Sequence, residues 1–251
     1  MISKVGIESN VILIDKAEKD TIFEVLQYDS VNETSRKNNI LDKNVKVNDS
    51  NKLRQIKIIL DNTVVRIQKN SLCYIKGNIE EREEEDRYKS LKEILFSNKY
   101  NNITSNYKTI LSGAGEILLK PSFEYFTLAE LIDDEIIIKD EAFCACDEEI
   151  EVNRVNDDEL VLKGNGIVVL KLPVPENEII RCRIFKDRII ADKNISILRS
   201  HNITCQEDKS ILINEEGLNI YSGTGEVWLL PTKIVYNNDA NKSFEDLDDD
   251  E

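Results

Sequence analysis

The sequence predicts an all-β protein made of three tandem β repeats in a pseudo-threefold arrangement. One observation is a glycine pair at two-residue spacing that occurs three times, in SGAGEILL, KGNGIVVL and SGTGEVWLL, each followed by a proline. Six of the nine glycines and three of the four prolines fall in this pattern, a concentration that chance does not explain. The other is a recurring block upstream of each pair, in which two apolar runs flank a polar turn. Such internal repetition is typical of repeat architectures.

The upstream blocks are interpreted as β-hairpins, because an apolar β-branched run, a short polar turn and a second apolar run are typical of a hairpin. They are VVRIQKNSLCYI (64–75), EIIIKDEAFCAC (135–146) and RIIADKNISILR (188–199). Asn70, Glu141 and Asn194 align at the turn, where asparagine tolerates left-handed backbone angles. Each repeat is therefore expected to contain a hairpin, a connection and a strand with the glycine pair.

A single β domain is expected over residues 1–238, with repeat one at about 20–120, repeat two at about 121–172 and repeat three at about 173–233. Leu91, Ile94 and Leu95 have helical spacing, so one short amphipathic helix is predicted near Glu83 to Phe96, inserted in the first repeat. Residues 30–51 are polar and turn-rich, and are expected to form a loop or an extra edge hairpin. Residues 239–251 are predicted to be an acidic disordered tail.

The glycine pairs are predicted to be structural. A phosphate-binding glycine loop opens a helix, whose free amides hold the anion, whereas these glycines lead into strand-like apolar runs. Glycines two apart on a strand leave a bare strip on one face, which lets another backbone approach closely. We expect the three glycine strands to meet around the pseudo-threefold axis. The structural repeat glycines are Gly113, Gly115, Gly164, Gly166, Gly223 and Gly225.

Composition and charge narrow the class of protein. No apolar run approaches the roughly 18 residues that span a bilayer, and no secretory signal is recognised, so we expect a cytoplasmic protein without a membrane span. The net charge of −15 repels phosphate backbones, and nucleic acid is therefore not an expected partner. The five cysteines, an odd number, are expected to be free thiols in a reducing compartment.

No catalytic, cofactor-binding or metal-binding residue is predicted. His201 is the only histidine, which argues against a metal enzyme that needs several, and we expect it at a turn or on the surface. Cys144 and Cys146 could ligate a metal, but no second cysteine pair completes a site. Cys144 aligns with Cys73 and with Ile197 of the other repeats, so core packing is the expected role.

The tandem blocks ending in G-x-G-x-(V/I)-x-L strands, preceded by AFCA (142–145) and SLCYIKGNIE (71–80), resemble the AIM24 family over roughly residues 20–233. Asn70 and Glu141 stand where the family usually has glycine. The resemblance implies an all-β fold of the TRAP-like, double-stranded β-helix type, with three similar units in one chain. It implies no established catalytic activity, and the link of mitochondrial members to inner-membrane organisation suggests scaffolding.

Three functions compete at this point. The leading one is a non-enzymatic scaffold or protein-interaction module that binds a protein partner or associates with itself through strand or face pairing. The alternative is a small-molecule or lipid-binding module with an apolar cleft between repeats. An enzyme is the weakest candidate, and it would gain support if His201 lay in a closed pocket beside a carboxylate.

Overall fold

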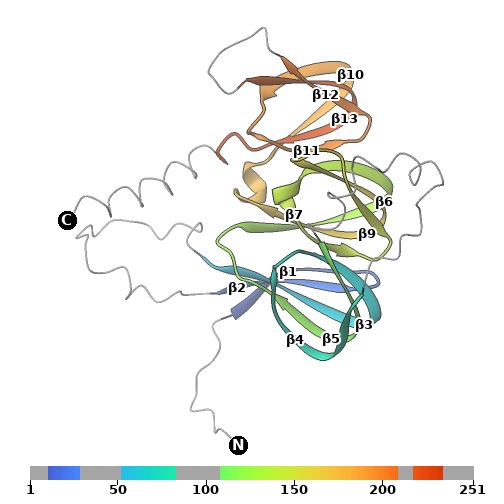
Figure 1. The fold of residues 1–251 in the computed structure, drawn as a ribbon. Helices are drawn as coiled ribbons and strands as arrows, with labels where there is room; N and C mark the ends of the chain where they lie inside the picture. Colours follow the sequence, from blue (N-terminus) through green and yellow to red (C-terminus); the bar gives the residue numbers. More distant parts are fainter. Residues whose placement is uncertain (1–10, 29–51, 83–107, 209–216, 234–251) are drawn as a thin grey trace, which may run out of the picture.

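The computed structural model describes residues 11–28, 52–82, 108–208 and 217–233, which form an all-β fold (Figure 1). Thirteen strands belong to one sheet, and its strand pairs are antiparallel, so the predicted all-β class is confirmed. The predicted helix near residues 83–96, the polar segment 30–51 and the acidic tail 239–251 lie outside the described residues.

The strands are long and rich in isoleucine, leucine and valine, which suit a pleated and partly buried surface. In chain order they are β1 (Val11–Glu18), β2 (Ile22–Tyr28), β3 (Arg54–Gln68), β4 (Leu72–Arg82), β5 (Lys108–Leu119), β6 (Tyr125–Lys139), β7 (Phe143–Asp147), β8 (Ile150–Arg154), β9 (Glu159–Leu172), β10 (Ile180–Asp192), β11 (Ser196–Ser200), β12 (Ile203–Asp208) and β13 (Leu218–Leu229). Two short 3-10 turns, η4 (Asp140–Ala142) and η5 (Glu176–Glu178), follow β6 and β9.

Three groups of strands share one pairing pattern, and we call them units 1, 2 and 3. In unit 1, β5 lies between β3 and β4. In unit 2, β9 lies between β6 and the two short strands β7 and β8. In unit 3, β13 lies between β10 and the two short strands β11 and β12. The central strand of each unit is the one that carries the glycine pair.

The predicted hairpins are wrong in their pairing, although their strands and turns are present. In unit 1 a turn joins β3 to β4, and its Asn70 has the expected left-handed φ of 63°. β3 and β4 nevertheless pair with opposite sides of β5, and not with each other. The hydrophobic pattern predicts where strands and turns lie, whereas the pairing partner is a backbone distant in sequence. The same correction applies to β6 with β7 and to β10 with β11.

Each unit is curled, because a short turn joins two strands that lie on opposite sides of its central strand. The first flanking strand bends at a bulge opposite the glycine pair. The residues at these bulges, Asn62, Asp133 and Lys186, have φ values of 58°, 49° and 50°. A bulge inserts an extra residue into one strand of a pair and increases its local twist. The three units therefore curl at equivalent positions.

The units lie in a row, with unit 1 at the lower end of Figure 1 and unit 3 at the upper end. β3 of unit 1 pairs with β7 of unit 2, and β6 of unit 2 pairs with β11 of unit 3. β1 and β2 extend the sheet beyond β3. Among the described strands, none of unit 3 pairs with one of unit 1. The predicted pseudo-threefold arrangement around a common centre is therefore not the arrangement of these strands.

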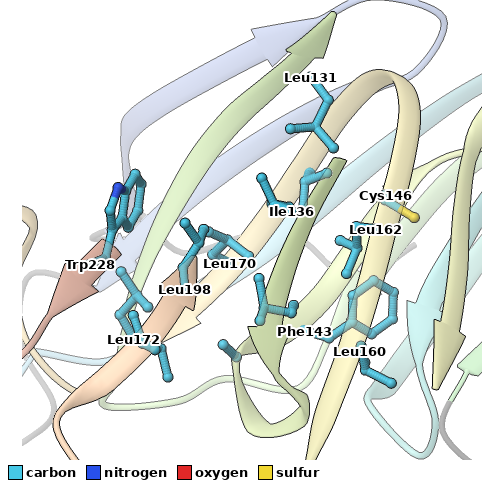
Figure 2. Close-up of a cluster of buried hydrophobic side chains, with 14 of the residues drawn as sticks. Leu131, Ile136, Phe143, Cys146, Leu160, Leu162, Leu170, Leu172, Leu198 and Trp228 are labelled. Carbon is cyan, nitrogen blue, oxygen red and sulfur yellow. The ribbon is translucent and has the colours of Figure 1, made fainter. Parts of the chain in front are cut away.

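The two larger hydrophobic cores cross the boundaries between units. The first combines the interior of unit 1 with Cys144 and Ala145 from β7 of unit 2. The second combines the interior of unit 2 with Leu198 and Trp228 from unit 3, and Figure 2 shows Leu198 beside Leu170. The outer face of one unit thus closes the interior of the unit before it.

Candidate functional site

The first glycine of each pair lies opposite β4, β8 or β12, the strand that pairs with the central strand on the side away from β3, β6 or β10. A Cβ atom on Gly113 would lie only 2.0 Å from the backbone oxygen of Asn78 in β4. One on Gly164 or Gly223 would lie 2.1 or 2.3 Å from a backbone oxygen in the turn just before β8 or β12, that of Glu149 or Asn202. These three glycines have φ between +135° and +140°, which side chains rarely adopt. The bare strip is filled by a backbone of the same unit. The expectation that the three glycine strands meet around one axis is therefore wrong, and the close approach of backbone within each unit explains these glycines.

The second glycine makes room for a polar side chain in units 2 and 3. A Cβ atom on Gly166 would lie 2.8 Å from Cβ of Asp147, and one on Gly225 would lie 2.6 Å from Cβ of Ser200. Each of these side chains accepts a hydrogen bond from the backbone N–H that follows the glycine, at 2.8 Å for the Asp147 carboxylate and 2.9 Å for the Ser200 hydroxyl. In unit 1 the backbone oxygen of Lys76 approaches Gly115 instead.

These contacts occupy the space over each glycine pair, where a phosphate group would have to bind. Asp147 and Ser200 were not predicted as partners of the glycines. The signal was present in the aligned blocks, because both residues follow the equivalent positions Cys144 and Ile197 by three residues.

Asp147 should make stability depend on pH. Burial raises the pKa of this fully buried carboxyl above its ordinary value of 3.8, although the hydrogen bond from Ile167 opposes the shift. The folded protein therefore binds the proton more tightly than the unfolded chain, and this contribution to stability falls as pH rises from about 4 through the raised pKa. We expect Asp147→Asn to remove that slope in urea-unfolding free energies measured over a pH series. The exposed Asp61→Asn is the matched control, and parallel curves for the wild type and Asp147→Asn would contradict the assignment.

Cys144 and Cys146 are buried in the core, as predicted. Burial raises the pKa of both thiols to about 12, which keeps them protonated at neutral pH. The thiolate is the form that acts as a nucleophile or metal ligand. Within the described ranges, no group of three or more metal-ligating side chains comes together.

Cys73 is exposed, which contradicts the core role expected from its alignment with Cys144 and Ile197. The physical reason is its place in the row of units. The strands that carry Cys144 and Ile197 each pair with the preceding unit, whereas in the described part of the chain β4 pairs only with β5. Equivalent positions in the sequence thus face different surroundings.

His201 lies in the turn between β11 and β12 and its side chain is 51% exposed, in agreement with the surface position predicted for it. Its Nδ1 atom is 3.3 Å from Oε1 of Glu135, and its backbone N–H donates to the backbone carbonyl oxygen of Glu135. The histidine therefore lies beside a carboxylate, but at the surface instead of in a closed pocket.

A surface hollow between units 1 and 2 is lined mainly by polar and charged side chains, among them Lys69, Asp140, Glu141 and Arg154. A second hollow, beside Gly113, is also polar, with Glu80 and Arg82 in its lining. Neither hollow has the apolar lining that a lipid-binding cleft between repeats requires.

Exposed apolar side chains gather on three edge strands. β1 and β10 end the strand order of the sheet, and β4 pairs only with β5 in the part that the structure describes. Among the described residues, eight of the eleven exposed large apolar side chains lie on these strands, and we call them the edge apolar residues: Ile12, Leu13, Ile14, Tyr74, Ile75, Ile180, Phe185 and Ile190. An edge strand has unpaired N–H and C=O groups, so apolar side chains on it favour pairing with another chain.

Comparison with known proteins supports the all-β fold and assigns the chain to a protein family. A family model described as AIM24, Mitochondrial biogenesis AIM24, matches residues 45–232. The crystal structure of a protein from Streptococcus pyogenes, a structural genomics target, is similar with a TM-score of 0.52 and 16% sequence identity, over 77% of this chain and 94% of that one. At this identity the likeness supports the fold alone. No curated protein matches this chain. The described residues contain no helix long and apolar enough to cross a membrane.

Proposed function

Because this chain belongs to the AIM24 family, we propose that it is a non-enzymatic β scaffold that binds protein partners or further copies of itself through the edges of its sheet. The observation that carries the proposal is the concentration of exposed apolar side chains on β1, β4 and β10. Peptide groups at a sheet edge supply affinity through main-chain hydrogen bonds, and apolar side chains add buried area. We further propose that the three units are structural repeats of the TRAP-like, double-stranded β-helix type. Their equivalent bulges and glycine contacts support this interpretation.

The residues with catalytic potential support a non-enzymatic role, since each has a structural explanation. The Asp147 carboxylate accepts a backbone N–H beside Gly166, and the two buried cysteines are held as thiols. His201 is at a surface turn. A cytoplasmic location and the absence of nucleic acid among the partners remain predictions from charge and sequence.

Lysine at an edge apolar position should reduce protein binding, and Phe185→Lys is the sharpest single change because this side chain on β10 is 75% exposed. Loss of one buried aromatic contact at an interface is expected to lower affinity at least about tenfold. The immobilised wild-type chain and its variants would be incubated with native cell extract, and bound proteins quantified by mass spectrometry. Leu13→Lys tests β1 in the same way.

The matched control is Ile132→Lys. Ile132 is 69% exposed, but it lies at the bulge of β6, which pairs with β9 and β11. The proposal expects a defined set of proteins to bind the wild type and the control, and to be depleted on the edge variants. Equal capture by all four chains contradicts it. Stabilisation of the wild type by a metabolite or lipid in a thermal-shift screen, with protein capture unchanged, would favour the small-molecule or lipid-binding alternative.

A further inference from the structure

The two junctions between units use the same backbone pairing. Both join a flanking strand, just beyond its bulge, to the first short strand of the next unit. The pairs at the first junction are Val65 with Asp147, Arg66 with Cys146 and Ile67 with Ala145, and those at the second are Ile136 with Ser200, Ile137 with Arg199 and Ile138 with Leu198. Val65 and Ile136 each lie three residues after the positive-φ residue of their bulge. The junction is therefore one repeated interface.

Unit 3 has the first half of this interface without its partner. Three residues after Lys186, the equivalent positions of β10 are Ile189, Ile190 and Ala191. Val65, Ile67, Ile136 and Ile138 are buried at the two formed junctions, whereas Ile189 and Ala191 are only partly buried and Ile190 is 43% exposed. In the described part of the chain β10 pairs with β13 alone.

The interior of unit 3 is also incomplete. Its core has four buried residues, Ile184, Ile203, Tyr221 and Val227, and is surrounded by partly buried side chains that include Cys182, Cys205 and Leu229. The cores of units 1 and 2 are larger, because each includes side chains from the unit that follows. No further unit follows unit 3 among the described residues.

Unit 1 has the second half of the interface without its partner. The register on the central strands makes Tyr74 equivalent to Ala145 and Leu198, which close the interiors of units 1 and 2. Tyr74 is 43% exposed, its neighbour Cys73 is exposed, and Leu118 beside them on β5 is only partly buried. In units 2 and 3 the equivalent face covers the interior of the preceding unit. In unit 1 this face, on β4, covers no other unit in the described structure.

We propose that these two faces bind each other between copies of this chain, with β10 of one copy antiparallel to β4 of the next. This inference rests on the proposed scaffold function and names a second copy as the partner. The register of the two formed junctions places Ile189 opposite Lys76, Ile190 opposite Ile75 and Ala191 opposite Tyr74. β4 and β10 lie at opposite ends of the row in Figure 1, so the partner of each comes from another molecule. The contact joins different surfaces of the two copies, and such heterologous contacts generate rings or filaments.

The test uses two variants of the full chain, each of which blocks one half of the contact. Tyr74→Lys blocks β4, and Ile190→Lys blocks β10; both side chains are exposed in the single chain, so the fold should be retained, which a circular dichroism melt checks. By sedimentation velocity, the wild type is expected to form species larger than a dimer as its concentration rises. Each variant alone is expected to remain a single chain. An equimolar mixture should form a dimer and stop there, because only one intact pair of faces remains.

Phe123→Lys is the control, because Phe123 is also exposed, at 49%, but lies in the connection between β5 and β6. This variant is expected to associate like the wild type. A wild type that sediments as a single chain at every concentration overturns the inference, as does association that both variants retain or a mixture that forms no dimer. If the sedimentation experiment fails but Phe185→Lys captures fewer proteins from cell extract than the wild type, the sheet edges bind other proteins. The proposed function would then stand without the inference. Failure of both experiments would remove both proposals.

Discussion

Replacing Gly164 with alanine should lower the free energy of unfolding by about 4 kcal/mol, a large effect for a single methyl group. The added Cβ would lie 2.1 Å from the backbone oxygen of Glu149 and 3.2 Å from its carbonyl carbon, so the backbone of the turn between β7 and β8 would have to move. The φ of +135° adds backbone strain for any side chain. In a chain of this length, such a loss lowers the melting temperature by roughly 10 °C. A thermal melt with urea unfolding measures it.

Gly217→Ala is the control for this prediction. Gly217 also has a positive φ, of +77°, but the nearest atom to an added Cβ is Oε1 of the Glu207 side chain at 3.6 Å. Gly217→Ala should therefore lower the free energy of unfolding by only about 1 kcal/mol, the cost of placing a side chain at a positive φ. If Gly164→Ala and Gly217→Ala destabilise the protein equally, the close approach of the Glu149 backbone is not what requires the glycine.

The second large effect is expected at the ion pair between Glu159 and Arg199, which joins β9 of unit 2 to β11 of unit 3. Both side chains are nearly buried, with exposed fractions of 12% and 10%, and the guanidinium donates to both carboxylate oxygens. Glu159→Gln should destabilise the protein by about 3 kcal/mol, because it leaves the charge of Arg199 buried without its counter-charge. Urea unfolding measures this loss.

The pH dependence of the same pair has a definite sign. Burial alone would raise the pKa of Glu159, but the hydrogen bonds and positive charge of Arg199 lower it below its ordinary value of 4.5. This contribution to stability is therefore present above about pH 4.5 and is lost as the pH falls through the lowered pKa. Glu159→Gln should remove that dependence.

Two further variants separate burial from charge in this prediction. Arg183 pairs with Glu226 on the surface, where its side chain is 88% exposed, so Arg183→Gln should change stability by less than about 1 kcal/mol. Replacing Glu159 and Arg199 together with leucine should be less destabilising than Glu159→Gln, because no unpaired charge is left. If Glu159→Gln lowers the free energy of unfolding no more than Arg183→Gln does, the Glu159–Arg199 pair does not stabilise the junction between units 2 and 3.

The bulge residues and the edge strands illustrate what sequence patterns leave open. Asn62, Asp133 and Lys186 interrupt the apolar runs in LDNTVV, LIDDEII and IFKDRII, which was a visible signal for a break in each strand. Their positive φ and their place opposite the glycines come from the pairing with the central strand. The exposed ends of the row had no such signal, because an apolar run has the same pattern whether a neighbouring strand covers it or not.

By itself the sequence determined the all-β class, the positions of many strands and turns, and the AIM24 family. Those properties follow from local patterns, in which residue type decides backbone preference and burial. Only the tertiary structure decided which strands pair, that the units lie in a row, and that Cys73 is exposed while Cys144 is buried. These depend on contacts between residues far apart in the chain, where equivalent positions have different neighbours because a row, unlike a closed ring, has two ends.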